Sequence, residues 1–150
     1  MMAAEFACAN NKPFGFNLSA PFLIQFELEK IKAVLPYADY VFCNEDEQAA
    51  MQIALDSSNV AETIANIEKK NTKRPKRVVI MTQGPLPTQV CVGDHSEGCV
   101  TTHENVEVPA LDKDLIVDTN GAGDSFVGGF FAGVLTGQDV RKCVEMGNEL

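Results

Sequence analysis

Two glycines and an aspartate lie together in the stretch Gly121-Ala122-Gly123-Asp124. An apolar run, Leu115-Ile116-Val117, comes shortly before it, and a helical pattern follows. Backbone N–H groups and the positive end of a helix dipole converge at a strand-to-helix turn of this kind, so it suits an anion. The residues therefore predict a phosphate site in which the turn donates N–H groups and Asp124 supplies a base.

Several better-known glycine motifs do not fit this stretch. A Walker A loop ends in Gly-Lys-Ser/Thr, and the next lysine here is Lys142. A dinucleotide fingerprint would want glycine where Phe126 stands. A calcium loop that began at Asp118 would place Ala122 and Gly129 at ligand positions, and neither has a side chain that can bind.

A simpler interpretation of the turn stays open. Gly121 and Gly123 could shape a tight connection, with Asp124 only favouring the helix dipole. Three further glycines in the helical pattern would each cost about 1 kcal/mol relative to alanine, so we expect that helix to pack closely on a neighbour. They are Gly128, Gly129 and Gly133.

Strand-like and helix-like segments alternate along the chain. Strands are predicted at 14–18, 40–43, 77–82 and 115–117, and helices at 27–34, 44–55 and 60–70. Three short alternating segments at 89–92, 100–102 and 106–108 predict an antiparallel meander. The helix over 44–55 is expected to face inward with Ala49, Ala50, Ile53 and Ala54. This order predicts an α/β layered sandwich with an open, mainly parallel sheet.

Ligands of open α/β sheets bind beyond the carboxyl ends of the strands. The residues that follow the predicted strands are therefore the candidates for a site. They are Asn17 to Phe22, Asn44 to Glu47, Thr82 to Gly84, and Thr119 to Asp124.

Residues 118–130 resemble the signature of the ribokinase-like carbohydrate and nucleoside kinases, the PfkB family. The element Asn44-Glu45-Asp46-Glu47, the turn Thr82-Gln83-Gly84 and the final motif follow one another in that family's order. The segment Asn17-Leu18-Ser19-Ala20-Pro21-Phe22 narrows the resemblance to the branch that phosphorylates adenosine. The similarity extends over nearly all 150 residues.

The resemblance implies a layered α/β/α ribokinase-like sandwich and a nucleoside kinase of purine salvage. Its reaction is transfer of the γ-phosphoryl group of ATP to the 5′-hydroxyl of adenosine, giving AMP and ADP. Asp124 takes the position of the catalytic base, and Gly121, Ala122 and Gly123 that of an anion hole for the transferring phosphoryl group. A loose transition state needs orientation and charge compensation more than early deprotonation.

The other roles are likewise implied by the resemblance. Thr82 and Gly84 would approach the ATP phosphates, and Asn148 would lie in the ATP adenine region. The nucleoside side would be contacted by Asn17, Phe22 and Asn120. Asn44 and Glu47 would organise Mg²⁺, often through water. Lys113 departs from the family, because some of its adenosine-phosphorylating members have glutamine there.

Three of these positions also have structural interpretations. Asn44-x-x-Glu47 has the spacing of a helix capping box, as does Asn59-x-x-Glu62, which follows a Ser57-Ser58 loop and is expected to be mainly a cap. Thr82-Gln83-Gly84 could be a plain strand-ending turn. Phe22 could be a core aromatic.

Two further clusters invite a function. Cys91, His95, Cys99 and His103 recur every four residues, which suggests zinc, but a meander would spread them apart. The basic residues Lys69, Lys70, Lys73, Arg74, Lys76 and Arg77 could form a nuclear signal or a nucleic-acid patch. A solvated helix end is the interpretation that we favour for them.

Composition limits the partners. A net charge of −9 argues against nucleic acid or an anionic membrane, and five cysteines without a CxxC pair suit a cytoplasmic protein, with a nuclear location also open. The resemblance implies adenosine and ATP as substrates and Mg²⁺ as cofactor, and the full-length form is expected to be a monomer.

The resemblance also predicts that the chain is one partial kinase domain over 1–150. The N-terminal substrate and lid part and the C-terminal end would lie outside it, so the chain alone is expected to be inactive. A ribokinase-like sugar kinase and a truncated, inactive nucleotide-binding module remain the alternatives.

Overall fold

The computed structural model describes residues 1–111 and 119–150. The strand expected at 115–117, Lys113 and Asp118 lie outside the described residues. The chain forms two compact units, each described by itself below. Unit 1 comprises Met1–Thr82 and Gln89–Glu104, and unit 2 comprises Gln83–Thr88 and Asn105–Leu150.

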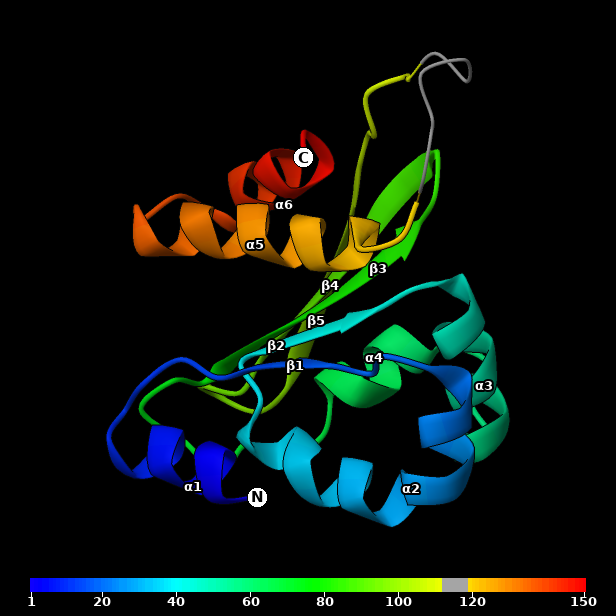
Figure 1. Ribbon diagram of the computed structural model, residues 1–150. Coiled ribbons are helices and arrows are strands. Elements are labelled where there is room, and N and C mark those ends of the chain that lie inside the picture. The colour runs from blue at the N-terminus through cyan, green and yellow to red at the C-terminus, as the bar shows by residue number, and fades with distance from the viewer. Residues whose placement is uncertain (112–118) are drawn as a thin grey trace. The chain divides into compact units, whose positions relative to one another are not determined.

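One five-stranded sheet runs through the described chain in the order β1-β2-β3-β4-β5 (Figure 1). The strands are β1 Gly15–Asn17, β2 Tyr40–Cys43, β3 Lys76–Gln83, β4 Leu86–Asp94 and β5 Val100–Val106. β1, β2 and β3 are parallel. A two-residue connection joins β3 to β4, and only an antiparallel pair permits that. The predicted α/β class, parallel strands and meander are therefore confirmed, although the segment at 106–108 is not a strand of its own.

The helices of unit 1 connect and cover the parallel strands. They are α1 Met2–Ala9, α2 Pro21–Val34, α3 Glu45–Leu55 and α4 Val60–Ala65, with a 3₁₀ turn at Leu35–Tyr37. α2 begins earlier than its apolar pattern predicts, because Pro21 suits the first turn of a helix and a kink at Glu27 separates the two halves. α4 ends at Ala65, five residues before its predicted end.

The core of unit 1 lies between these helices and the sheet. Val41, Val79 and Met81 from the strands pack with Ile24, Met51 and Ile64 from α2, α3 and α4. The predicted inner face of α3 is wrong in part, since Ile53 is 85% exposed and Ala49 is also exposed. Glu47 turns inward to cap the helix. Met51, one turn later on the same face, is therefore buried in place of Ile53.

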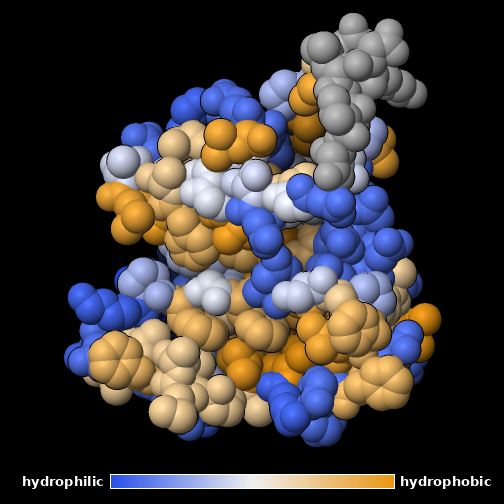
Figure 2. All heavy atoms as spheres, viewed as in Figure 1, coloured by the Kyte–Doolittle hydropathy of each residue, from blue (hydrophilic) through white to orange (hydrophobic). Residues whose placement is uncertain are grey.

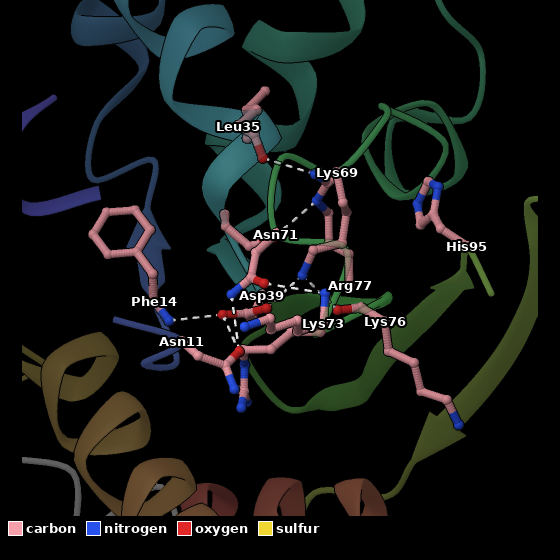
Figure 3. Close-up of polar contacts among 12 residues, drawn as sticks. Asn11, Phe14, Leu35, Asp39, Lys69, Asn71, Lys73, Lys76, Arg77 and His95 are labelled. Atoms are coloured by element: carbon pink, nitrogen blue, oxygen red, sulfur yellow. Dashed lines mark hydrogen bonds and ion pairs between the residues drawn. The ribbon is translucent and has the colours of Figure 1, made fainter. Parts of the chain in front are cut away.

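A buried ionic cluster lies at the amino end of β2 and β3 (Figure 3). The Asp39 carboxylate accepts hydrogen bonds from the backbone N–H of Phe14, at 2.9 Å, and from Lys69 Nζ, and it pairs with Arg74 Nε at 3.3 Å. Lys69 Nζ also donates to the carbonyl oxygen of Lys76 at 2.8 Å. Burial lowers the pKa of Lys69, and the bond to Asp39 opposes that shift.

Arg77 is completely buried and points into the same region (Figure 3). Its guanidinium donates to the carbonyl oxygens of Leu35, Ala38, Ile64, Ala65 and Ile67. These carbonyls lie in the connections after α2 and at the end of α4, where helices leave acceptors unpaired. Lys69 and Arg77 thus connect buried segments of unit 1 through hydrogen bonds. The expectation of a fully solvated basic cluster is wrong for these two residues.

Unit 2 is built on two packed helices, α5 Ala122–Leu135 and α6 Val140–Asn148. A Cβ on Gly129 would lie 2.4 Å from the Met146 carbonyl oxygen, and one on Gly133 would lie 2.8 Å from Cys143 Sγ. Close packing of α5, predicted from its glycines, is confirmed at these two positions. A Cβ on Gly128 would meet nothing within 4 Å, so packing does not explain that glycine.

Some apolar side chains of unit 1 lie outside its core. On α1 and α2, Phe6 is 67% exposed and Phe26 is 80% exposed. Figure 2 shows apolar atoms on the surface over the part of the view where Figure 1 places these helices. Over residues 1–111 and 119–150, none of the helices combines the length and apolar character that crossing a membrane requires.

Candidate functional site

The parallel strands of unit 1 bring three predicted site residues to one edge of the sheet. Asn17 is the last residue of β1 and lies opposite Phe42 of β2. Cys43 lies opposite Met81, so Asn44 and Thr82, the next residues, are level with each other. The Thr82 hydroxyl donates to the Cys43 carbonyl oxygen at 3.5 Å. This is the carboxyl edge, where ligands of open α/β sheets bind.

The segment after β1 is held in a compact turn. Asn17 Oδ1 accepts the N–H of Ser19 at 3.0 Å, and the Ser19 hydroxyl donates to the Asn17 carbonyl oxygen at 3.1 Å. Leu18 is buried in the core, whereas Phe22, in the first turn of α2, is 59% exposed. The core interpretation of Phe22 is therefore wrong, and its ring is available for contact at the edge that bears Asn17.

Asn44 and Glu47 form a complete capping box at the start of α3. The N–H of Glu47 donates to Asn44 Oδ1 at 2.9 Å, and the N–H of Asn44 donates to Glu47 Oε2 at 3.1 Å. Glu47 is 4% exposed. Burial raises the pKa of its carboxyl group, the bond from Asn44 opposes this, and the charges of Asp46 and Glu45 add to it. The structural interpretation of this pair is confirmed; its metal role stays a prediction.

The second pair with this spacing differs in environment. Asn59 caps α4 by accepting the N–H of Glu62 at 3.1 Å, as the sequence predicts. The Glu62 carboxylate accepts a hydrogen bond from Asn59 Nδ2 at 2.8 Å rather than from the backbone N–H of Asn59. The Glu62 side chain is 43% exposed. Of these two glutamates, only Glu47 therefore places a buried carboxyl group at the carboxyl edge of the sheet.

Thr82 and Gly84 lie where β3 turns into β4. β3 continues to Gln83, and Gly84 has φ of 55°, a conformation that glycine adopts at no steric cost. Gln83 Nε2 donates to the Pro87 carbonyl oxygen at 3.3 Å across the turn. The strand-ending interpretation is confirmed by this geometry, and contact of Thr82 and Gly84 with ATP phosphates stays a prediction.

The glycine turn of unit 2 leads directly into α5. Gly121 is its N-cap, with φ of 80°, so that position needs glycine. The N–H of Ala122 donates to Thr119 O at 3.2 Å, and the N–H of Ser125 donates to Gly121 O at 2.9 Å. The Ala122 N–H is thus already used within the turn, and an anion hole at Gly121, Ala122 and Gly123 stays a prediction.

The N–H groups of Gly123 and Asp124 remain available at this helix end. Neither has a hydrogen-bond partner among the residues that the structure describes. Side chains cap α3, α4 and α6 through Asn44, Asn59 and Asp139, whereas α5 has no side-chain cap. A Cβ on Gly123 would meet nothing within 4 Å, so its helix cost of about 1 kcal/mol relative to alanine is not explained by packing.

Asp124 lies in the first turn of α5, and it is exposed. Within the described residues its carboxylate has neither an ion pair nor a hydrogen bond. Asn120, predicted to contact the nucleoside, lies in the turn directly before the helix. Unit 2 thus places an open pair of N–H donors, a free carboxylate and an amide residue within five positions of one another.

Asn148, at the end of α6, is engaged by protein atoms. Its Oδ1 accepts the Thr88 hydroxyl at 3.0 Å, and its Nδ2 donates to the Glu107 carbonyl oxygen at 3.3 Å. The predicted role near the ATP adenine is not tested by these contacts. They do show that both ends of the amide already have partners within unit 2.

A family model described as pfkB family carbohydrate kinase matches residues 1–150. The chain belongs to the PfkB family. The adenosine kinase of Dictyostelium discoideum is 44% identical to it over 95% of this chain and 41% of that protein. The adenosine kinase of Schizosaccharomyces pombe is 43% identical, over 98% of this chain and 42% of that protein.

Solved structures of PfkB relatives have the same fold. Anopheles gambiae adenosine kinase in complex with P1,P4-di(adenosine-5) tetraphosphate gives a TM-score of 0.88 at 35% identity, covering 99% of this chain and 43% of that one. Schistosoma mansoni adenosine kinase in complex with 2-fluoroadenosine gives 0.86 at 32%, with coverage of 99% and 43%. The chain thus spans less than half the length of these relatives.

Membership of the PfkB family implies Mg²⁺, so the oxygen atoms of Asn44 and Glu47 can be compared with those that Mg²⁺ needs. Asn44 Oδ1 and Glu47 Oε2 each accept a backbone N–H in the capping box, and within the described part of the chain Glu47 Oε1 has no hydrogen bond. Mg²⁺ usually keeps several waters and takes one or two carboxylates. The pair therefore fits an ion held through water and does not form a direct cage.

Zinc is not supported by the four cysteines and histidines of the meander. Cys91 Sγ lies 3.9 Å from His103 Nε2, and Cys99 Sγ lies 3.7 Å from His95 Nε2, so they form two separate pairs. Within 1–111 and 119–150, no three His, Cys, Asp or Glu side chains are grouped to hold a metal. The prediction that the meander spreads these residues apart is wrong in part, because they meet in two pairs.

Thr88 was missed by sequence reasoning, because the alternating pattern was recognised only from residue 89. It lies on β4, is 1% exposed, and bonds to Asn148. Its place two residues before the buried Val90 is the signal that could have found it, since alternate strand residues share a face.

Proposed function

We propose that this chain carries the phosphoryl-transfer part of an adenosine kinase, which moves the γ-phosphoryl group of ATP to the 5′-hydroxyl of adenosine. The observation that carries the proposal is the start of α5, which has no side-chain cap and where, among residues 1–111 and 119–150, the N–H groups of Gly123 and Asp124 and the Asp124 carboxylate have no partner. Such a helix end attracts phosphate through its N–H groups and its dipole. The similarity to adenosine kinases over nearly the whole chain supports the choice of substrates.

In this proposal the residues at the start of α5 have separate catalytic roles. The Asp124 carboxylate accepts the proton of the adenosine 5′-hydroxyl as that oxygen attacks the γ-phosphorus. The N–H groups of Gly123 and Asp124 bind the charge that develops on the transferring phosphoryl oxygens, as donors do in an oxyanion hole. Gly121 holds the left-handed turn that directs them, and Ala122 closes it through its bond to Thr119.

The remaining site residues supply binding. Asn17, Phe22 and Asn120 are proposed to contact the nucleoside. Thr82 and Gly84 are proposed to contact the ATP phosphates. The Anopheles gambiae relative was solved with two adenosines joined by four phosphates, a ligand that suits a site for both adenosine and ATP.

Mg²⁺ would supply charge neutralisation of the ATP phosphates when it is bound. Glu47 is the residue of this chain proposed to orient it, through water and by way of Oε1. The capping box fixes the carboxylate in place before any ion arrives, because both Asn44 and Glu47 are held by backbone N–H groups.

Two properties of the whole protein are part of the proposal. Five free cysteines suit the cytoplasm, and the net charge of −9 disfavours nucleic acid and anionic membranes as partners. We also propose that the full-length protein is a monomer. A sugar kinase of the same family is the second candidate, and the exposed Phe22 favours the nucleoside, since an aromatic ring can stack on a base.

A chimera tests the function. Residues 1–150 replace the matching part of the Dictyostelium discoideum adenosine kinase, and ATP-dependent formation of AMP from adenosine is measured. We expect activity, and we expect Asp124→Asn to lower kcat by at least about a hundredfold, as loss of a general base does. Binding of adenosine should be largely unchanged.

Asp139→Asn is the matched control. Asp139 is also an acid at a helix start in unit 2, where it accepts the N–H of Lys142 at 2.8 Å, and asparagine can replace it as a cap. A chimera that folds and binds adenosine but forms no AMP would contradict the proposal. So would an Asp124→Asn chimera with near-normal turnover.

A further inference from the structure

The contacts of Asn148 begin a chain of packing that ends at the proposed phosphate turn. The Thr88 hydroxyl that donates to it belongs to a side chain only 1% exposed. A buried hydroxyl without a partner is costly, and Asn148 is the partner that the structure gives this one. The bond therefore resists opening, and it holds the end of α6.

The second link is the residue next to Asn148. A Cβ on Gly147 would lie 2.8 Å from the ring carbons of Phe126 and 2.9 Å from its carbonyl oxygen. The backbone of α6 thus lies directly against the start of α5, with Phe126 6% exposed. Packed interiors transmit small displacements, so a shift of α6 at this point shifts Phe126.

The third link is α5 itself. Phe126 lies two residues after Asp124 on the same helix, within its first two turns. Because a helix is stiff over so short a distance, the position of Phe126 sets the direction of the N–H groups of Gly123 and Asp124. All of these residues belong to unit 2.

We propose that Asn148 is a positioning residue, which acts through Gly147 and Phe126 to fix the first turn of α5. Its role in phosphoryl transfer rests on the proposed function, whereas its effect on the turn does not. A site that must meet a transferring group needs its donors held by a second layer of contacts. The pair Thr88–Asn148 supplies that layer.

Amide hydrogen exchange measured by NMR tests the inference without any ligand. Thr88→Val removes the hydroxyl and keeps the shape of the side chain. We expect exchange at the amides of Ala122 and Ser125 to become about tenfold faster, the effect of losing one hydrogen bond of ordinary strength. Amides of residues 131–135, in the second half of α5, should be unchanged, and Thr88→Ser should restore slow exchange.

Asn148→Ala should reproduce the effect, and the double variant should show no more than Asn148→Ala alone, because that variant already removes the bond to Thr88 together with the bond to Glu107. Asn148→Asp keeps the acceptor for Thr88 and should keep slow exchange at both amides, and Thr88→Val carries the test where the alanine variant does not fold. Asn66→Ala is the matched control, since Asn66 is an exposed residue at the end of a helix in unit 1.

Three results would overturn the inference. One is unchanged exchange at Ala122 and Ser125 in the Thr88→Val and Asn148→Ala chains. Another is equal acceleration along all of α5, which would indicate general stability only. The third is a shift of the Asn148 side-chain amide signal with ATP but not with inorganic tripolyphosphate, which would indicate adenine contact. Failure of tripolyphosphate to shift the Gly123 and Asp124 amides of the unaltered chain would instead contradict the proposed function.

Discussion

The carboxyl group of Glu47 combines a structural and a proposed functional role in one side chain. It is buried, it caps α3, and it is the carboxylate proposed to orient Mg²⁺. Burial is the largest cause of its raised pKa, so this carboxyl group is protonated more readily in the folded chain than in the unfolded one. An ion near Oε1 would favour the charged form instead.

The raised pKa of Glu47 predicts that the stability of the chain depends on pH. Since the pKa is higher in the folded state, folding takes up a proton, and the contribution of Glu47 to the free energy of unfolding is largest below its ordinary value of 4.5. It falls as the pH rises from there through the raised pKa. Urea unfolding of the parent and of Glu47→Gln across this range should show the parent losing stability relative to the variant.

Glu62→Gln is the control for this measurement, because Glu62 has the same place in a helix start without being buried. A constant difference between the parent and Glu47→Gln over the whole pH range would contradict the account of Glu47.

Residue identity predicted part of this site. The spacing of Asn44 and Glu47 indicated either a cap or a metal role, and the structure contains the cap. The burial that separates Glu47 from Glu62 depends on packing against distant segments, which local spacing does not contain. The same limit applies to Ala122, whose N–H is taken by Thr119 through the geometry of the turn.

At the scale of elements, the packing of α5 on α6 depends on two of its glycines and not on a third. Gly129→Ala should destabilise unit 2 by about 1 to 3 kcal/mol, because its Cβ would lie 2.4 Å from a backbone oxygen that cannot rotate away. Gly128→Ala should be neutral or stabilising by up to about 1 kcal/mol, since that position is open and alanine favours a helix.

Thermal unfolding of the two variants measures this difference. Equal loss of stability in both, or a stable Gly129→Ala chain, would show that the close approach of α5 and α6 is not what these glycines provide.

Elements were the most predictable level. β2 was predicted with its observed bounds, and buried β3 and the meander followed from their apolar patterns. The buried face of α3 was not predicted correctly, because the charged side chain of Glu47 turns inward. The early start of α2 was missed because the apolar run at 22–26 resembles a strand as closely as a helix.

In the molecule as a whole, a buried ionic cluster stabilises unit 1. The number of charged residues alone would suggest that its basic side chains lie at the surface. Lys69→Met would leave the Asp39 carboxylate buried without its closest cation, and loss of one partner of a buried pair costs about 3 to 5 kcal/mol. Chemical denaturation should detect this loss. Lys70→Met, at the neighbouring exposed position, should change stability by less than about 0.5 kcal/mol.

Similar values for Lys69→Met and Lys70→Met would contradict the structural role of the cluster. The sequence did indicate the basic residues as a group, but not which of them are buried. Only the fold, which brings Asp39 and the carbonyls after α2 and α4 to Lys69 and Arg77, separates the internal pair from the solvated ones.

Binding of the ATP phosphates by the turn from Gly121 to Asp124 is the claim on which the proposed function depends, and amide NMR of the chain titrated with ATP and Mg²⁺ measures this binding. We expect saturable shifts at Gly123 and Asp124, with the capped starts of α4 and α6 unaffected. Absence of shifts at the turn, or equal shifts at the start of α6, would contradict the claim.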